Sequence, residues 1–137
     1  MKEIESEKLI ITCTQEKIFN FLSDFNNFGK LMPEQIINWQ STENTCSFTS
    51  KGMTDLSMQI KEKMPSHTIL ISSYGKVPFD FELKCSFEDL GNYQTKSQLI
   101  FIADLNPMLS MMASKPLQNF VNMLNAKLKI MAEEPGF

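Results

Sequence analysis

Apolar and polar residues alternate most regularly between positions 79 and 88. Phe79, Phe81, Leu83, Cys85 and Phe87 are apolar, and every residue between them is charged or a serine. A period of two places successive side chains on opposite faces of a strand. The segment therefore predicts a strand of an antiparallel sheet, with one face buried and the other in water.

Shorter segments of the same kind lie on both sides of this stretch. The further predicted strands cover residues 4–13, 38–42, 45–51, 53–64, 67–76 and 93–105. Pro65-Ser66 and Gly91-Asn92 are turn-forming pairs between them, and Gly52 marks the end of a hairpin over 38–51. The sequence thus predicts a sheet of about seven antiparallel strands.

The period changes to that of a helix after residue 105. Apolar residues follow at spacings of three and four, which places them on one stripe: Leu117, Phe120, Val121, Leu124, Leu128 and Met131. Asn106 is suited to cap a helix and Pro107 to occupy its first position. We predict one long helix over 106–134, which Pro116 should kink or split in two.

Two short helices are predicted between the first strand and the hairpin. Thr14 can cap a helix that carries Ile18 and Leu22 on one side. A break at 24–27 precedes a second short helix or turn, which Pro33 ends.

This order of elements predicts an α+β architecture. A long amphipathic helix that follows only strands needs a broad concave sheet to cover its apolar stripe. A sheet curved around one helix readily leaves space between the two. We therefore expect an internal cavity there, where a small molecule can bind.

The order of elements resembles the helix-grip fold of the START/Bet v 1-like superfamily (SRPBCC), often labelled polyketide cyclase/dehydrase and lipid transport. The similarity is strongest over residues 10–25, IITCTQEKIFNFLSDF, which resemble the family's first strand and the helix after it. Residues 79–88 and the segment PLQNF at 116–120 agree with it. The resemblance covers essentially all of residues 1–137, which we interpret as one domain of this type.

The resemblance implies a curved antiparallel sheet around the last helix, with an apolar cavity between them. Members of the superfamily include lipid and sterol carriers, plant hormone receptors, aromatase/cyclases and co-chaperones of heat-shock proteins. They share no catalytic signature, so the fold by itself does not decide among these functions.

Composition bears mainly on partners. The 137 residues are 42% hydrophobic and 21% charged, with a formal net charge of −3, and all 13 basic residues are lysines scattered along the chain. The absence of arginine and of a basic tract counts against nucleic-acid binding. The acidic, polar beginning is unlike a secretory signal, and no apolar run reaches the ~18 residues of a membrane span. We expect a cytoplasmic protein without integral membrane association.

Metal, cofactor and nucleophilic chemistry have little support in the sequence. Cys13, Cys46 and Cys85 are far apart in strand-like segments, which favours buried, reduced cysteines over disulfides. His67, the sole histidine, follows a turn and is expected at the surface. One histidine without paired cysteines does not make a typical zinc site, so we expect neither a metal nor a cofactor.

The main functional hypothesis is binding or carriage of a small hydrophobic or amphipathic ligand without catalysis. The predicted lining residues are large apolar side chains from the sheet and the last helix: Trp39, Phe48, Met58, Phe81, Leu83, Met112, Phe120 and Leu124. Methionine suits an adaptable pocket because its thioether side chain is flexible. Met108, Met111 and Met112 precede Pro116 and are expected at a mobile cavity mouth.

Two alternatives remain open at this point. The first is a cyclase- or dehydratase-like enzyme in the same cavity, for which a desolvated Asp104, or Tyr74 or Tyr93, would transfer protons. The second is a co-chaperone-like interaction module with an exposed apolar patch. The sequence does not indicate the ligand or the oligomeric state.

Overall fold

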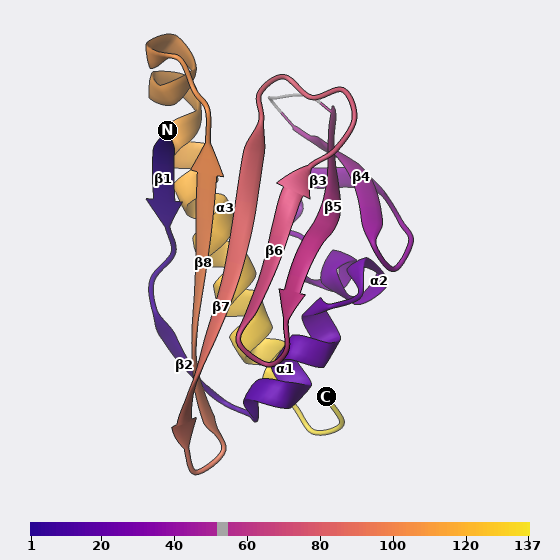
Figure 1. Ribbon diagram of the computed structural model, residues 1–137, viewed down its shortest axis with the longest axis vertical. Coiled ribbons are helices and arrows are strands. Elements are labelled where there is room, and N and C mark those ends of the chain that lie inside the picture. The colour runs from indigo at the N-terminus through magenta and orange to yellow at the C-terminus, as the bar shows by residue number, and fades with distance from the viewer. Residues whose placement is uncertain (52–54) are drawn as a thin grey trace.

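The computed structural model shown in Figure 1 describes residues 1–51 and 55–137. The strands are β1 (Lys2–Glu5), β2 (Leu9–Thr12), β3 (Ile36–Ser41), β4 (Thr45–Ser50), β5 (Asp55–Met64), β6 (Thr68–Ser73), β7 (Phe81–Gly91) and β8 (Gln94–Ala103). The helices are α1 (Gln15–Leu22), α2 (Phe25–Phe28), the short 3-10 helix η1 (Gly29–Leu31) and α3 (Pro107–Ala132). The α+β prediction is confirmed. Gly52 lies outside the described residues.

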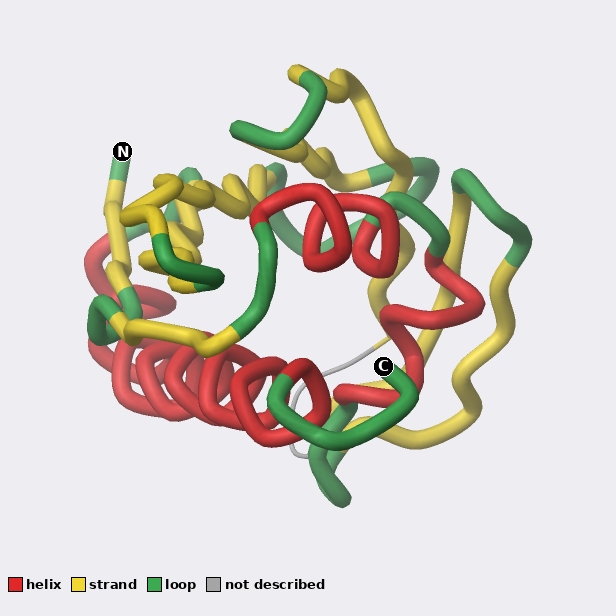
Figure 2. Tube along the Cα trace, turned by 90° about the horizontal axis from the view of Figure 1, so that it is seen from below, coloured by secondary structure: helices red, strands yellow, loops and turns green. Residues whose placement is uncertain are grey.

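The strands form one antiparallel sheet in the order β1-β8-β7-β6-β5-β4-β3, and β2 also pairs with β8. Neighbours from β3 to β8 are consecutive in the chain, whereas the first two strands pair with the last one. Helix α3 packs against β1, β2 and β8. Figure 2 shows that the sheet is curved, with α3 running along its concave side. This is the predicted helix-grip arrangement.

The predicted first strand, 4–13, is interrupted by three residues. Ser6 explains the break. Its Oγ accepts the Leu99 N–H at 2.9 Å, in place of the backbone carbonyl that would accept this N–H in a continuous strand. Its own N–H donates to the Leu99 carbonyl at 2.8 Å. The Ser6 side chain thus replaces one backbone partner in the pairing with β8. Residues 6–8 are not in a strand, and β2 begins at Leu9.

Both predicted helix caps are confirmed. Thr14 Oγ1 accepts the Lys17 N–H at 3.3 Å, and Asn106 Oδ1 accepts the Leu109 N–H at 2.8 Å. The two short helices after the first strands are also present.

Helix α3 is continuous through Pro116, so of the two predicted effects, a kink or a split, the split does not occur. Pro116 removes one backbone hydrogen bond, but Ala113 and Leu117 on either side of it are buried against the sheet. No helix in the described ranges is long and apolar enough to cross a membrane.

Candidate functional site

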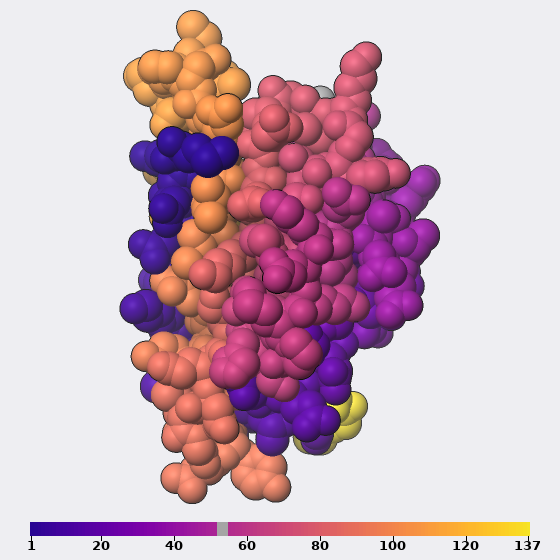
Figure 3. Space-filling model, viewed as in Figure 1, coloured from indigo at the N-terminus to yellow at the C-terminus, as the bar shows by residue number. Residues whose placement is uncertain are grey.

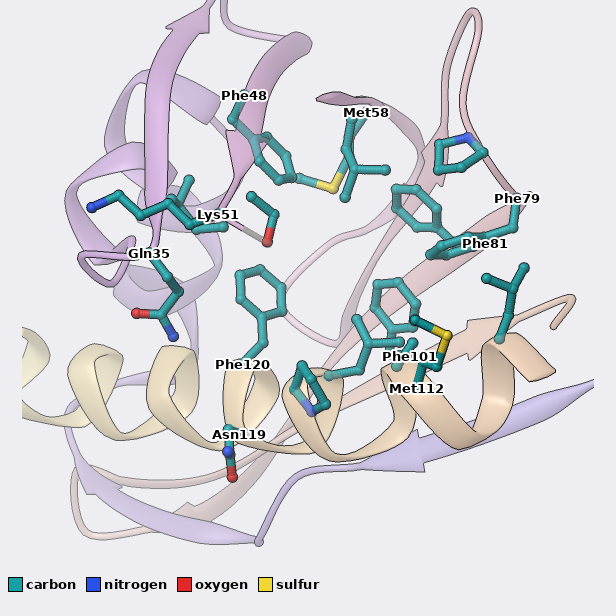
Figure 4. Close-up of a pocket in the computed structure, with 18 residues that line it drawn as sticks. Gln35, Phe48, Lys51, Met58, Phe79, Phe81, Phe101, Met112, Asn119 and Phe120 are labelled. Carbon is teal, nitrogen blue, oxygen red and sulfur yellow. The ribbon is translucent and has the colours of Figure 1, made fainter. Parts of the chain in front are cut away.

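A cavity of about 700 Å³ lies between the curved sheet and the N-terminal half of α3 (Figure 4). Most of its lining is apolar: Ile36, Phe48, Leu56, Met58, Pro78, Phe79, Phe81, Phe101, Leu109, Met112, Ala113, Pro116, Leu117 and Phe120. The polar lining residues are Gln35, Ser50, Lys51 and Asn119. This volume is within the range of about 300–1,000 Å³ typical of small-molecule sites.

The sheet side of the cavity contains a cluster of three phenylalanine rings. Phe81 of β7 and Phe101 of β8 stack with ring centroids 5.0 Å apart, and Phe79 lies 5.9 Å from Phe81. The period of two in the strands directs Phe81 and Phe101 to the concave face, and Phe79 joins them from the loop before β7. The three rings present an apolar surface to the interior.

The helix side is formed by residues three and four apart on α3. Leu109, Met112, Ala113, Pro116 and Phe120 share one face of the helix and line the cavity. The small side chain of Ala113 leaves room between its larger neighbours. The face nearer the C-terminus, which carries Leu124 and Leu128, is fully buried in the core instead.

The other end of the space between helix and sheet is filled by the short helices. Ile18, Leu22, Phe25 and Phe28 of α1 and α2 are almost completely buried there. Helix α1 packs against β6 and β7. The cavity is therefore confined to one end of the molecule.

The predicted ligand-binding residues fall into two groups. The cavity is lined by Phe48, Met58, Phe81, Met112 and Phe120. The core outside it holds the remaining members, Trp39, Leu83 and Leu124.

Distance along each element explains this division. Leu83 and Leu124 point in the predicted direction but lie further toward the end that α1 and α2 fill, and both have no exposed surface. Trp39 stacks between Phe28 and Phe48, with centroid distances of 6.5 and 5.5 Å. It supports the cavity through Phe48 without facing it.

The predicted ligand-binding residues did not include Phe101 or Phe79, although the alternation over 79–88 placed Phe79 on the buried face. Phe101 alternates with polar or less buried residues in the same strand as Leu99 and Ala103, so the period of two predicts that its side chain faces the interior. Phe79 precedes β7, and its position at the cavity depends on the loop between β6 and β7, which the pattern does not define.

The predicted cavity mouth is exposed. Met108, Met111 and Met112 have 71%, 86% and 69% of their surfaces exposed, and Met112 also lines the cavity. The N-terminal end of α3 projects beyond the sheet (Figures 1 and 3).

The acid–base candidates lie outside the cavity. Asp104 is exposed, and Tyr74 and Tyr93 are 48% and 74% exposed. Asp104 is not desolvated, as the enzyme alternative required, because the apolar strand ends at Ala103 and the next residue is exposed. No Asp, Glu or His is among the described residues that line the cavity.

The cysteines are buried and the histidine is at the surface, as predicted. Cys13, Cys46 and Cys85 are buried and unpaired, and burial raises the pKa of Cys46 and Cys85 to about 12. Thiols with such pKa values are poor nucleophiles at neutral pH. His67 is exposed. Residues 1–51 and 55–137 contain no cluster of His, Cys, Asp or Glu suited to a metal ion.

Comparison with solved structures shows the fold. A START superfamily protein from Mycobacterium smegmatis matches with a TM-score of 0.71 and 16% identity, covering 96% of this chain and 97% of that one. The protein XoxI from Bacillus cereus matches with a TM-score of 0.75 and 9% identity, covering 96% of each chain. The subunit of the Aha1 dimer from Colwellia psychrerythraea matches with a TM-score of 0.67 and 18% identity over the whole of both chains.

No protein-family model and no curated protein matches the sequence. The chain has a START/Bet v 1-like, helix-grip fold.

Proposed function

We propose that this protein binds a small hydrophobic or amphipathic molecule in the cavity and carries it without chemical change. The observation that supports the proposal is the cavity itself, about 700 Å³ in volume and lined mainly by phenylalanine, methionine and aliphatic side chains. Burial of ligand surface against them contributes roughly 25 cal/mol per Å².

The first experiment is native mass spectrometry of the freshly purified protein, before and after extraction with organic solvent. A discrete additional mass that the solvent releases is the expected result. A second test blocks the cavity. Ala113→Phe adds a ring where the small side chain of Ala113 lines the cavity, and should abolish the additional mass.

The matched control is Ala126→Phe, which makes the same change at an exposed position of α3. This variant should retain the bound molecule. Equal retention by both variants would contradict binding in the cavity. Circular dichroism of each variant shows whether the fold is intact.

A second candidate function is supported by the exposed methionines at the N-terminal end of α3. Met108 and Met111 are mostly exposed and do not line the cavity, and an apolar surface of this kind suits contact with another protein. In this alternative the chain is a co-chaperone-like interaction module. The double variant Met108→Gln, Met111→Gln should then no longer bind the partner protein, but should still bind any ligand of the cavity.

The catalytic alternative required an inward-facing ionisable group at Asp104 or Tyr74. Both side chains are exposed, so no observation at these positions favours a cyclase- or dehydratase-like reaction.

A further inference from the structure

The polar groups of the cavity gather on one side of it. Gln35 and Ser50 come from the segment before β3 and the end of β4, and Lys51 follows directly. The rings of Phe79, Phe81 and Phe101 lie on the opposite side (Figure 4). The cavity is therefore amphipathic: its polar groups lie at one side, next to Phe48 and Phe120, and the cluster of Phe79, Phe81 and Phe101 lies at the other.

Backbone pairing holds the polar side together. The Lys51 N–H donates to the Gln35 carbonyl at 2.9 Å, and Ile36 pairs with Ser50 in the sheet. These bonds hold residues 35 and 51 side by side, and both line the cavity. Figure 4 shows both polar ends at the edge of the cavity, with the Lys51 stem nearer the interior.

These two groups have unused capacity to donate hydrogen bonds. Lys51 is absent from the ion pairs formed within the described residues, which join Lys61 to Glu82, Lys96 to Glu88 and Lys129 to Glu133. Within residues 1–51 and 55–137, the side-chain hydrogen bond of Gln35 Nε2 is to the Met123 sulfur, at 3.6 Å. Thioether sulfur is a weak acceptor.

The charge on the described residues that line the cavity is positive. Lys51 is the charged residue among them, and no carboxylate accompanies it. Asn119, the remaining polar lining residue, points away from the interior on the outer side of α3 (Figure 4). An anionic group at the rim would meet an ammonium and an amide donor, whereas the ammonium would repel a cationic group.

We propose that the ligand is an amphipathic anion, an apolar molecule whose carboxylate pairs with Lys51 and Gln35 at the rim while its tail lies against the phenylalanine cluster. This inference rests on the proposed function, since it specifies the chemical class of the molecule bound in the same cavity.

The test measures displacement of a neutral fluorescent probe, N-phenyl-1-naphthylamine, from the delipidated protein. The competitors share one alkyl chain and differ in head group: dodecanoate, 1-dodecanol and dodecylamine. A partly exposed charge pair contributes up to about 1 kcal/mol, so dodecanoate should bind about fivefold more tightly than the alcohol, and dodecylamine more weakly than either.

Lys51→Gln should weaken the binding of dodecanoate more than that of 1-dodecanol, which removes the fivefold preference. Lys127→Gln is the matched control, because it makes the same change at an exposed lysine of α3 outside the cavity lining. Lys51→Glu should reverse the preference in favour of dodecylamine. This reversal cannot arise from partial unfolding, which would weaken all three ligands together.

Equal affinities of the wild-type protein for dodecanoate and 1-dodecanol would overturn this inference and leave the proposed function intact. Equal effects of Lys51→Gln and Lys127→Gln would also overturn it, since only the net charge would then matter. Failure of the probe and of all three competitors to bind would contradict the proposed function as well.

Discussion

At the scale of single residues, close packing around the lone tryptophan is the most sensitive feature of the molecule. Trp39 stacks with Phe28 and Phe48, and its indole lies directly over Gly29. A Cβ at position 29 would overlap the indole ring. Glycine is needed at this position for space, since its backbone has an ordinary helical conformation.

Gly29→Ala should therefore destabilise the protein. At a helical position without such a contact, the change normally stabilises by about 0.4–1 kcal/mol. Displacement of the indole costs about 1–3 kcal/mol, so we expect a net loss of about 1–2 kcal/mol in the free energy of unfolding. Urea denaturation followed by circular dichroism measures it. An increase in stability would show that the tryptophan moves aside without cost.

A second residue-scale feature is backbone strain at an exposed turn. Tyr93 follows Asn92 between β7 and β8, and both have positive φ, +60° and +52°. Glycine is the favoured residue at the second of these positions, where a bulky side chain is strained. Tyr93→Gly should raise the free energy of unfolding by a few tenths to about 1 kcal/mol, measured by the urea midpoint. A lower midpoint would mean that the tyrosine ring makes stabilising contacts across the hairpin.

At the scale of elements, one buried polar residue of α3 bonds to two other parts of the fold. Asn125 has no exposed surface, and its Oδ1 accepts the Ser97 hydroxyl at 2.7 Å. Its Nδ2 donates to the carbonyls of Glu7 and Ser97, at 2.9 and 3.0 Å. One side chain thus joins α3, β8 and the link between β1 and β2.

Asn125→Ala should destabilise the protein by about 2–3 kcal/mol, because it leaves buried hydrogen-bonding groups without partners. The control is Asn122→Ala, which removes a single exposed bond from the Glu7 N–H at 2.9 Å. This variant should lose less than about 1 kcal/mol. Similar losses for the two variants in thermal unfolding would contradict the special role of Asn125.

The elements that could be predicted are those determined by residues close together in the sequence. The Asn106 cap, the long last helix and the strand predicted over 79–88 depend on periodicity and nearby hydrogen bonds. The cap and the helix are confirmed, and the strand is present but begins at Phe81. The Ser6 break was missed because its cause is a contact with Leu99, 93 residues away. The role of Asn125 was missed for the same reason.

The candidate site was predictable in part. The direction of Phe48, Met58 and Phe81 follows from strand period, and each lines the cavity. The length of the cavity does not follow from period, because α1 and α2 decide how much space is filled. Leu83 and Leu124 face the interior but lie beyond that limit. Which of the lining residues contact a ligand is still a prediction.

At the scale of the whole molecule, ligand binding should stabilise the fold. A ligand that binds only the folded protein, at about one hundred times its Kd, adds about 2.7 kcal/mol to the free energy of unfolding. Saturation with the ligand identified by mass spectrometry should therefore raise the midpoint of thermal unfolding by several degrees. Ala126→Phe should show the same shift, and Ala113→Phe none. A shift in both variants would place the ligand elsewhere on the molecule.

The order of strands in the sheet also has a consequence for synthesis of the chain. Strands β1 and β2 pair only with β8, and α3 follows β8. While a ribosome is still adding the middle of the sheet, the first 12 residues have no strand to pair with. The cavity lacks its helical side until the final quarter of the chain has emerged. Loading with ligand is therefore an event of the finished protein, and the pairing of distant segments makes closure of the sheet a slow, late step of folding.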